Sequence, residues 1–432
     1  MTAGTLDVDS ALVRVSSEID EGALRAAIDV LTTQPSPFGG ERPLAEAIAA
    51  WGRRTHADLT WEVDALDGAS ANLMARSASG SAAPELALYS HLDTSLTGAS
   101  DRDVGVTGEV RIAPAPSFDQ TSRALRGFGI GVAKAPSAAG IVAFGASARA
   151  LRALGVAHRL TLLLAAGGTH RAAPSDVPAR FGRGVEHALA RGWRPDAVLN
   201  VKAGPPGVLH EEPAAAYLRV RLRRPWAAAL ARRAVAPDGG LARNAGAALD
   251  AIEEWRAEYL ARCGARGQLA PEIAIGAIRG GLPEKPDLLP GLLEIFVYAV
   301  LLPGEDPERV ARDLGAHIAA RAARMPGSPR VDVSVYASAP GGVVDAGSRI
   351  ARLATAAWAR HVGQTAPVRG WTGATDGAIF LARGIPTARV GVSVSRDEAD
   401  PRIEIVSLDE LVRAARAYAE VALRYFAQGS AA

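Results

Sequence analysis

Cysteine is almost absent from the sequence, which has only Cys263 among its 432 residues. A single thiol cannot form an internal disulfide, and this scarcity is typical of proteins from a reducing compartment. The first 22 residues have neither the basic region nor the apolar region of a secretory signal. No apolar run approaches the roughly 20 residues that span a bilayer. We therefore expect a cytoplasmic protein with no membrane partner.

Net charge is also nearly absent. The 48 basic and 46 acidic side chains leave a formal charge of +2, which creates no field that would attract nucleic acid or an anionic membrane. The arginines of "RVRLRRPWAAALARR" alternate along a predicted strand and indicate a solvated face, so we expect no nucleic-acid partner. A content of 48 % hydrophobic and 22 % charged residues is typical of a soluble globular protein. The length suggests two or three domains.

Helical and strand patterns alternate along most of the chain. "HRLTLLLAA" and "DAVLNVKA" are nearly continuous apolar strands of the kind that parallel sheets bury between helices. From residue 214 the order becomes β-α-β-β-α-β with alternating strands, which predicts a ferredoxin-like α+β unit. The sequence therefore predicts an α/β fold. Its discontinuous catalytic-type domain, with a mixed, mostly parallel sheet between helices, spans 1–213 and 339–432, and a lid domain is inserted at 214–338.

Several motifs follow one another in a characteristic order: "SHLDT", "GFGIGVAKAPSAAGIVAFGASARAL", "AIGAIRGGLPEKPDLLPG" and "GATDGAIFLARGIPT". With them the chain resembles, over nearly its whole length, the zinc exopeptidase and deacylase family of acetylornithine deacetylase, succinyl-diaminopimelate desuccinylase, aminoacylase and carboxypeptidase G. The resemblance implies a zinc-exopeptidase-like catalytic domain and a homodimer formed through the lid. It also implies two zinc ions at the carboxyl ends of the central strands, which activate a water and polarise an amide carbonyl.

The metal ligands that the resemblance implies are largely replaced. His91 and Asp93 match the first histidine and its partner acid. The positions of the bridging aspartate, the paired glutamates and a further acidic ligand hold, in that order, Val132, Gly167, Gly168 and Lys202.

A final histidine ligand is also missing. Asp400 or Pro401 stands at its position, and the last histidine in the chain is His361. Valine and glycine side chains cannot ligate a metal, and an ammonium group repels one. We therefore predict that the dizinc site is lost, and we expect neither a metal nor another cofactor.

Two lid residues of the family are replaced as well. The arginine that binds the substrate carboxylate falls on Val300. The only lid histidine, His317, lies within a predicted helix rather than at the position that reaches the partner's active site.

Three residues are candidates for catalysis: His91, Asp93 and Lys202. His91 and Asp93 end a strand, where ligands bind in open α/β sheets, and form either a general base oriented by its acid or a structural pair. Lys202 replaces part of the lost positive charge and can pair with Asp93 or with a substrate carboxylate or oxyanion. A desolvated Lys202 would also serve as a base or nucleophile. The alternative is a lysine that reaches solvent.

Six further residues are candidates for substrate binding: Lys134, His170, Arg369, Gly373, Thr375 and Asp376. Lys134 and Ser137 have the spacing of a Lys–Ser hydrolase pair, although Ser137 also suits a helix cap. The backbone amides of the "GGTHR" loop can bind an anion, and His170 can enter the vacated site, unless this is simply an exposed loop.

The "RGWTGATDGAIF" stretch supplies the remaining candidates. Its Gly–Ala–Thr–Asp turn, Gly373 to Asp376, lines the substrate site in relatives, or Thr375 and Asp376 only cap the next helix. Arg369 suits a substrate carboxylate. By contrast, "LHEEP", which contains His210, Glu211 and Glu212, is interpreted as a polar hinge, and "GFGIG" lacks the context of a phosphate loop.

Three functions are open from the sequence. The first is an enzyme that acts without metal on a small amide, peptide or related carboxylate-bearing substrate by hydrolysis, ring opening or acyl transfer. The second is an inactive homologue that binds a ligand or partners an active enzyme. The third is a metallohydrolase with a single-metal site rebuilt from His91, Asp93, His170 and Asp400. We favour the first, because a lysine in place of the acids keeps the local charge balanced.

Overall fold

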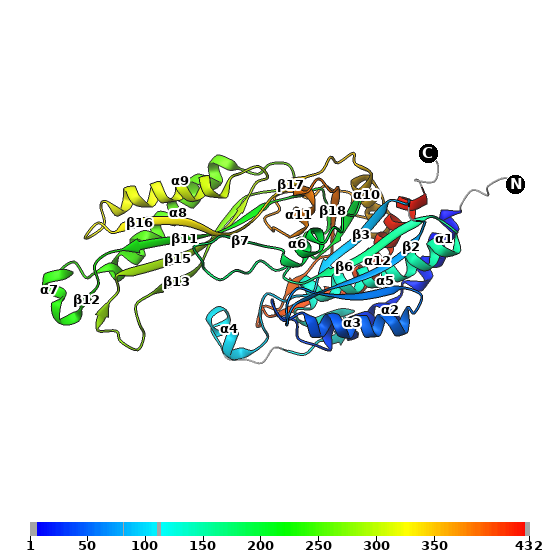
Figure 1. Cartoon of the computed structure of the whole chain (residues 1–432), viewed down its shortest axis with the longest axis horizontal. Helices are drawn as coiled ribbons and strands as arrows, with labels where there is room; N and C mark the ends of the chain where they lie inside the picture. Colours follow the sequence, from blue (N-terminus) through cyan, green and yellow to red (C-terminus); the bar gives the residue numbers. More distant parts are fainter. Residues whose placement is uncertain (1–6, 81, 110–113, 428–432) are drawn as a thin grey trace.

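The computed structural model of the chain describes residues 7–80, 82–109 and 114–427. Two β-sheets organise these residues, a seven-stranded sheet and a five-stranded sheet that lie toward opposite ends of an elongated molecule (Figure 1). Each sheet has its own hydrophobic cluster. The predicted α/β architecture with a second, α+β unit is confirmed.

The seven-stranded sheet brings the carboxyl ends of four parallel strands to one edge. Its order is β1-β2-β6-β3-β8-β18-β9, in which neighbouring pairs among β6, β3, β8 and β18 run parallel and the outer strands run antiparallel. The bounds are β1 Thr60–Ala65, β2 Ala71–Ser79, β3 Glu85–His91, β6 His158–Ala165, β8 Ala197–Val201, β9 Gly207–Leu209 and β18 Thr387–Gly391. As the apolar runs predict, β8 is buried along its whole length and β6 at every position but Arg159. The strand β3 is also buried throughout.

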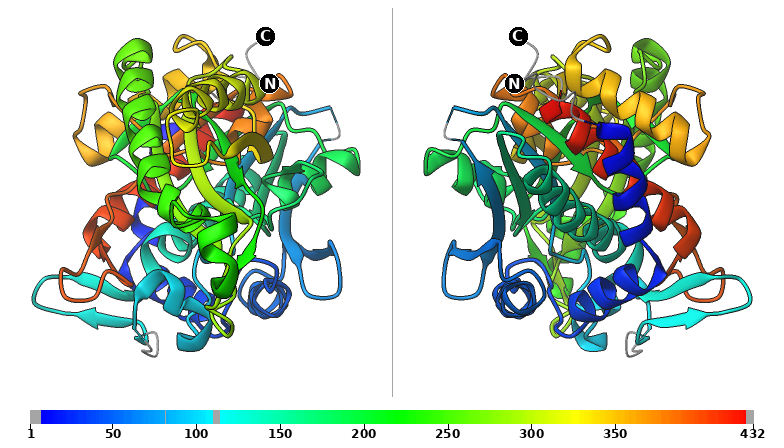
Figure 2. Two further views of the ribbon diagram at one scale, coloured as in Figure 1. Left: turned by 90° about the vertical axis from the view of Figure 1, so that its left-hand side faces the viewer. Right: turned by 90° about the vertical axis from the view of Figure 1, so that its right-hand side faces the viewer.

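Helices cover both faces of this sheet. One face packs on α1 Val8–Glu18, α2 Glu21–Thr32, α3 Arg42–Thr55, α5 Ala135–Ala153, α10 Arg349–Val362 and α12 Leu408–Ala427. The other face packs on α6 Arg183–Ala190 and α11 Gly377–Ala382. The helices α1 and α12, blue and red in Figures 1 and 2, lie side by side and join the two ends of the chain in one layer.

The central helix α5 is rich in small residues, which lets it approach the sheet closely. A Cβ atom added at Gly140 would lie 3.0 Å from a methyl group of Val201. The stretch Ile130–Ala153 is, by length and composition, apolar enough to cross a membrane, which we did not expect from the sequence, but 94 % of its most apolar window is buried inside the fold. Such burial is typical of a core helix.

The five-stranded sheet has the predicted ferredoxin-like core. The strands β13 Glu272–Gly280, β15 Leu292–Leu301, β11 Ala214–Arg223 and β16 Arg330–Ala339 pair antiparallel in this order. Two helices, α8 Asn244–Cys263 and α9 Pro307–Ala322, pack on one face through Trp255, Leu314 and their neighbours. We call this unit, residues 214–338, the lid.

A segment that follows β6 links the two sheets. Its short strand β7, Ala179–Arg180, pairs parallel with β16 at the edge of the lid sheet. Asp176 in the same segment forms ion pairs with Arg219 and Arg221 of β11. The "GGTHR" loop therefore begins at the edge of the larger sheet and leads directly to the lid.

Short elements complete the fold. They are α4 Ser100–Thr107, α7 Arg232–Val235, β4 Ser117–Asp119, β5 Ala124–Phe128, β10 Glu211–Glu212, β12 Ala227–Ala228, β14 Leu288–Leu289, β17 Gly342–Val343, β19 Ser395–Arg396 and β20 Ile403–Ser407. Short 3-10 turns occur at Ala229–Ala231 and Leu241–Arg243, and a π-helical turn, η1, at Ile130–Lys134 leads into α5. The small sheet of β19, β20, β5 and β4 lies beside η1 near the carboxyl edge of the large sheet.

Candidate functional site

A buried histidine–aspartate pair stands where β3 ends. His91 Nδ1 lies 3.1 Å from Asp93 Oδ1, and both side chains are almost wholly excluded from solvent. Burial alone would raise the pKa of Asp93, but the hydrogen bond and charge of His91 and the hydrogen bonds from Thr169 together lower it to about 2. Asp93 is therefore a carboxylate at neutral pH. It favours the tautomer in which His91 Nδ1 carries the proton and Nε2 is free to accept one.

The glycine loop after β6 wraps around this carboxylate. The backbone amide of Gly168 donates to Asp93 Oδ1 at 2.7 Å and that of Thr169 to Oδ2 at 2.8 Å, while the Thr169 hydroxyl donates to Oδ2 as well. The amide of Gly167 donates to Glu41 at 3.0 Å. The prediction that these amides bind an external anion is wrong, because carboxylates of the protein itself occupy them.

Gly168 is packed so closely that only glycine fits there. A Cβ atom at this position would lie 2.3 Å from His91 Cβ and 2.9 Å from Asp376 Oδ2. The loop at positions 167 and 168, where the resemblance implies glutamates, therefore lies directly against the histidine. His91 and Asp376 fill the space that a side chain would need.

Lys202, at the end of β8, is paired with an acid from another part of the chain. Its Nζ lies 2.7 Å from Asp376 Oδ1, and both side chains are buried. The sequence suggested Asp93 or a substrate as its partner, and the structure assigns Asp376 instead. Asp376 Oδ2 is buried and, among the described residues, has no hydrogen-bond partner.

We call the buried polar side chains at this edge the cluster; they are His91, Asp93, Asn200, Lys202, Glu212, Thr375 and Asp376. His170, on the glycine loop, lies near enough for charges of this cluster to affect it. Its ring stacks on Phe181 with centroids 4.4 Å apart, and Tyr217 donates a hydrogen bond to its backbone carbonyl. Burial is the main cause that lowers the pKa of His170 to about 4, with Asp376 and Lys202 acting in opposite directions. Whether His170 enters the former metal position stays a prediction, since its ring contacts Phe181 and Tyr298. Its ring is neutral at pH 7.

Three residues at this edge were not among the candidates from the sequence: Asn200, Glu212 and Arg389. Asn200 donates to Glu212 at 3.1 Å and to Thr375 at 3.3 Å, and all three side chains are buried. Arg389 of β18 is buried beside them, with its guanidinium 4.6 Å from the ring centre of Trp371. Burial raises the pKa of Glu212, while the Arg389 charge opposes this rise. Glu212, which the sequence analysis interprets as part of a polar hinge, is thus a buried side chain of the short strand β10 at the junction of the two units.

The remaining candidates divide into those near the cluster and those away from it. Thr375 belongs to the cluster, and its hydroxyl also accepts from the Gly377 amide at 3.2 Å. Asp376 makes no capping hydrogen bond to α11, so its ion pair with Lys202 is its main contact. Gly373 lies close to Trp371, where an added Cβ would approach the ring to 2.1 Å. Arg369 is exposed.

Lys134 and Ser137 do not form the suggested pair. Lys134 Nζ donates to Ser36 Oγ at 2.7 Å, whereas Ser137 lies inside α5 and donates to the backbone carbonyl of His91 at 3.2 Å. Ser137 also makes no capping hydrogen bond. The sequence spacing was misleading because Ser36 lies almost a hundred residues before its lysine partner.

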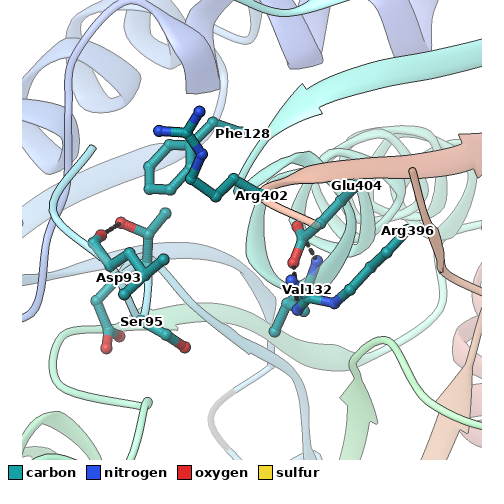
Figure 3. A pocket seen from close by; sticks show the side chains of 10 residues that line it. Asp93, Ser95, Phe128, Val132, Arg396, Arg402 and Glu404 are labelled. Carbon is teal, nitrogen blue, oxygen red and sulfur yellow. Dashed lines mark hydrogen bonds and ion pairs between the residues drawn. The ribbon is translucent and has the colours of Figure 1, made fainter. Parts of the chain in front are cut away.

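A small pocket that does not include His91 or Lys202 is lined in part by Asp93. Its cavity volume is about 50 Å³, and Figure 3 shows Asp93 and Ser95 on one side and Val132, Glu404 and Arg396 on the other. Glu404 accepts from the backbone amides of Gly131 and Val132 at 2.8 and 3.1 Å. Arg402 pairs with Asp400 at 2.7 Å. The bridging position of the resembled dizinc site is therefore an apolar wall of a water-sized pocket.

The residues present do not fit the two zinc ions that the resemblance implies. Both oxygens of Asp93 accept protein hydrogen bonds, Lys202 places an ammonium at a ligand position, and Asp400 pairs with Arg402. Within residues 7–80, 82–109 and 114–427, no group of three or more His, Cys, Asp or Glu side chains is arranged to hold a metal ion. The suggested single-metal site of His91, Asp93, His170 and Asp400 is not formed there.

The two sheets and the polar cluster at the strand ends define the class of fold, which is that of the M20 peptidases and related amidases. The aminopeptidase PepT from Bacillus cereus is 18 % identical, with a TM-score of 0.62 over 94 % of this chain and 99 % of that one. The M20 family metallo-carboxypeptidase Sso-CP2 from Sulfolobus solfataricus is 13 % identical, with a TM-score of 0.65 over 93 % of this chain and 99 % of that one. A hydantoinase/carbamoylase family amidase from Burkholderia ambifaria is 18 % identical, with a TM-score of 0.58 over 94 % of this chain and 98 % of that one. No family model and no curated protein matches the sequence.

These likenesses confirm the predicted fold and cover nearly the whole chain. At such low identity they establish the architecture, and the activity has to be argued from the site itself.

Proposed function

We propose that the chain is a hydrolase that cleaves a small amide or peptide without a metal ion, with His91 as its general base. One observation carries the proposal: His91 Nε2 is buried and, among the described residues, without a hydrogen-bond partner, while Nδ1 is held by a carboxylate. A histidine fixed in this way has one basic nitrogen, Nε2, that can take a proton from a water molecule or substrate beside it.

The chemistry requires only side chains of the cluster and one water molecule. A water molecule gives a proton to His91 Nε2 as its oxygen attacks the carbonyl carbon. When the C–N bond breaks, His91 returns that proton to the leaving nitrogen, so that an acid and an amine are released. Asp93 stabilises the imidazolium that forms in between. The buried Lys202 ammonium supplies positive charge near the oxyanion, a role that the family's metals would otherwise fill.

The surroundings of the cluster suit a small, polar substrate. His170 Nε2 is buried and, in the described part of the chain, has no hydrogen-bond partner, so it is available to a ligand's donor. We propose a small-molecule substrate and a cytoplasmic enzyme, in keeping with the composition.

Turnover of dipeptides and N-acetyl amino acids in the presence of a strong chelator tests this function. We expect the wild-type protein to stay active, and His91→Gln to lower kcat by about 100- to 10,000-fold. The matched control is His187→Gln on α6, whose histidine pairs with Asp64 away from the cluster and should leave turnover unchanged. Activity that the chelator abolishes, or that survives in His91→Gln, would refute the proposal.

An inactive ligand-binding protein is the second candidate, and one observation favours it. The glycine loop lies so close to the site that a Cβ atom added at Gly168 would clash with both His91 and Asp376. The same substrate panel separates the two functions, since compounds that raise the melting temperature without being hydrolysed would favour binding alone.

We also propose a homodimer formed through the lid. The strand β13 is an edge strand of the lid sheet, and most of its residues are exposed, including Ile278 at 51 %. Unpaired edge strands commonly pair with a second chain. The molar mass from light scattering tests this, and a monomer at all concentrations would contradict it.

A further inference from the structure

Lysine is rare in this protein. Only three of the 48 basic residues are lysines, Lys134, Lys202 and Lys285, and all the others are arginines. Lys202 pairs with Asp376 and Lys285 with Asp287. Lys134 differs from both, because within the described residues its ammonium group forms no ion pair and its only hydrogen bond is to Ser36. Lys134 thus presents a buried primary amine, which an arginine guanidinium would not supply.

Lys134 also lines a sizeable cavity. It is 5 % exposed, at the end of η1, and contributes to a cavity of about 330 Å³. The walls include Gln34, Pro35, Ser36, Thr94, Pro116 and Phe128. This cavity adjoins the small pocket at Asp93 through Thr94 and Phe128 but does not include His91 or Lys202.

The surroundings keep the amine reactive. Burial is the main cause that lowers the pKa of Lys134 to about 7, and the Asp93 carboxylate only partly opposes it. Near neutral pH a large share of the Nζ groups are therefore uncharged and carry a lone pair. Desolvated lysines of this kind act as nucleophiles toward carbonyl compounds.

Ser36 completes the arrangement. Its hydroxyl lies 2.7 Å from Lys134 Nζ and donates to the carbonyl of Leu92 at 2.7 Å, so it is fixed in place and buried. A hydroxyl at this distance can accept a proton from the amine and return it to a neighbouring oxygen. It is the only side chain among the described residues that forms a hydrogen bond with Nζ.

We propose that this cavity binds a small aldehyde or ketone with an apolar body and that Lys134 condenses with it to an imine. The Nζ lone pair forms a bond to the carbonyl carbon, and a proton moves from nitrogen to the former carbonyl oxygen, with Ser36 as the relay. The second N–H proton then follows to that oxygen as the C–O bond breaks, so that water leaves and a C=N bond remains. Phe128 and the prolines supply the apolar wall. This activity is separate from amide hydrolysis at His91, since it uses a different residue and a different cavity.

Reductive trapping tests the proposal on the full chain. The protein is incubated at about pH 7.5 with benzaldehyde and cyanoborohydride, which reduces an imine to a stable secondary amine. Benzaldehyde fits the cavity, since one of roughly 150 Å³ already holds benzene. Because the chain has three lysines and one N-terminal amine, peptide mapping by mass spectrometry locates every benzyl group.

We expect Lys134 to be labelled at least about tenfold faster than Lys285, because a larger fraction of its amine is uncharged. Lys285→Arg is the matched control and should leave the labelling of Lys134 unchanged. Ser36→Ala should slow it severalfold while the melting temperature shows that the fold persists. Equal labelling of Lys134 and Lys285, or none at Lys134, would overturn the proposal, and the wild-type map alone decides this.

Discussion

The close packing of Gly168 against the histidine makes a quantitative prediction about the glycine loop. In Gly168→Ala the new Cβ would lie 2.3 Å from His91 Cβ and 2.7 Å from its Cγ. His91 cannot move aside freely, because Asp93 holds its ring and the Gly168 amide holds Asp93. Overpacking of this kind costs about 1–3 kcal/mol, and a weakened hydrogen bond to a carboxylate adds about 1 kcal/mol. We expect the free energy of unfolding to fall by about 2–4 kcal/mol.

Urea denaturation near neutral pH measures this loss. The matched control is Gly246→Ala in α8, where the added Cβ would meet no described heavy atom within 4 Å beyond the nearby backbone of its own helix. Alanine there should stabilise the helix by about 0.5–1 kcal/mol. If Gly168→Ala proves as stable as the wild type, the loop is not packed on His91 as described. The same contact implies that Gly168→Glu cannot restore a metal ligand by itself.

Three further predictions concern the buried charges. The folded pKa of Asp93, about 2, lies below its ordinary value of 3.8, so its carboxylate should stabilise the fold by about 2 kcal/mol above pH 4. This stabilisation is lost as the pH falls through about 2, and urea titrations of Asp93→Asn should lack that pH dependence. The pKa of Lys134 is lowered from 10.5 to about 7, so between these pH values the unfolded chain binds more protons than the folded one. The free energy of unfolding of the wild type should therefore rise by roughly 2 kcal/mol between about pH 7 and 9, relative to that of Lys134→Met. Lys202→Met leaves Asp376 unpaired and should lower the free energy of unfolding, measured by calorimetry, by about 3–5 kcal/mol. Adding Asp376→Asn should recover part of this loss, and losses that simply add would contradict the ion pair.

Much of the fold follows from local sequence patterns. The continuous apolar runs at 158–165 and 197–201 predict strands buried on both faces, and the structure places them in the parallel centre of the large sheet. The alternating strands of 214–338 predict a sheet with helices on one face, as observed. These predictions succeed because the period of burial along an element depends mainly on nearby residues.

The site was only partly predictable. The pairing of His91 with Asp93 follows from their position two residues apart at a strand end, and the missing ligands are evident from the residue types. The inclusion of Glu212 was not predicted, because a polar residue in a short stretch is compatible with an exposed hinge. Its burial depends on β10, which brings it within 3.1 Å of Asn200 on β8.

The sequence by itself determined the layered fold and the chemical identity of the groups at the strand ends. Only the tertiary structure decided which groups meet there. Lys202 pairs with an acid 174 residues away, and Lys134 with a serine 98 residues away. Such contacts depend on how separate strands and loops are brought together, and no local periodicity encodes that. The same long-range packing closes the loop on His91 and leaves one amine, on Lys134, facing a cavity.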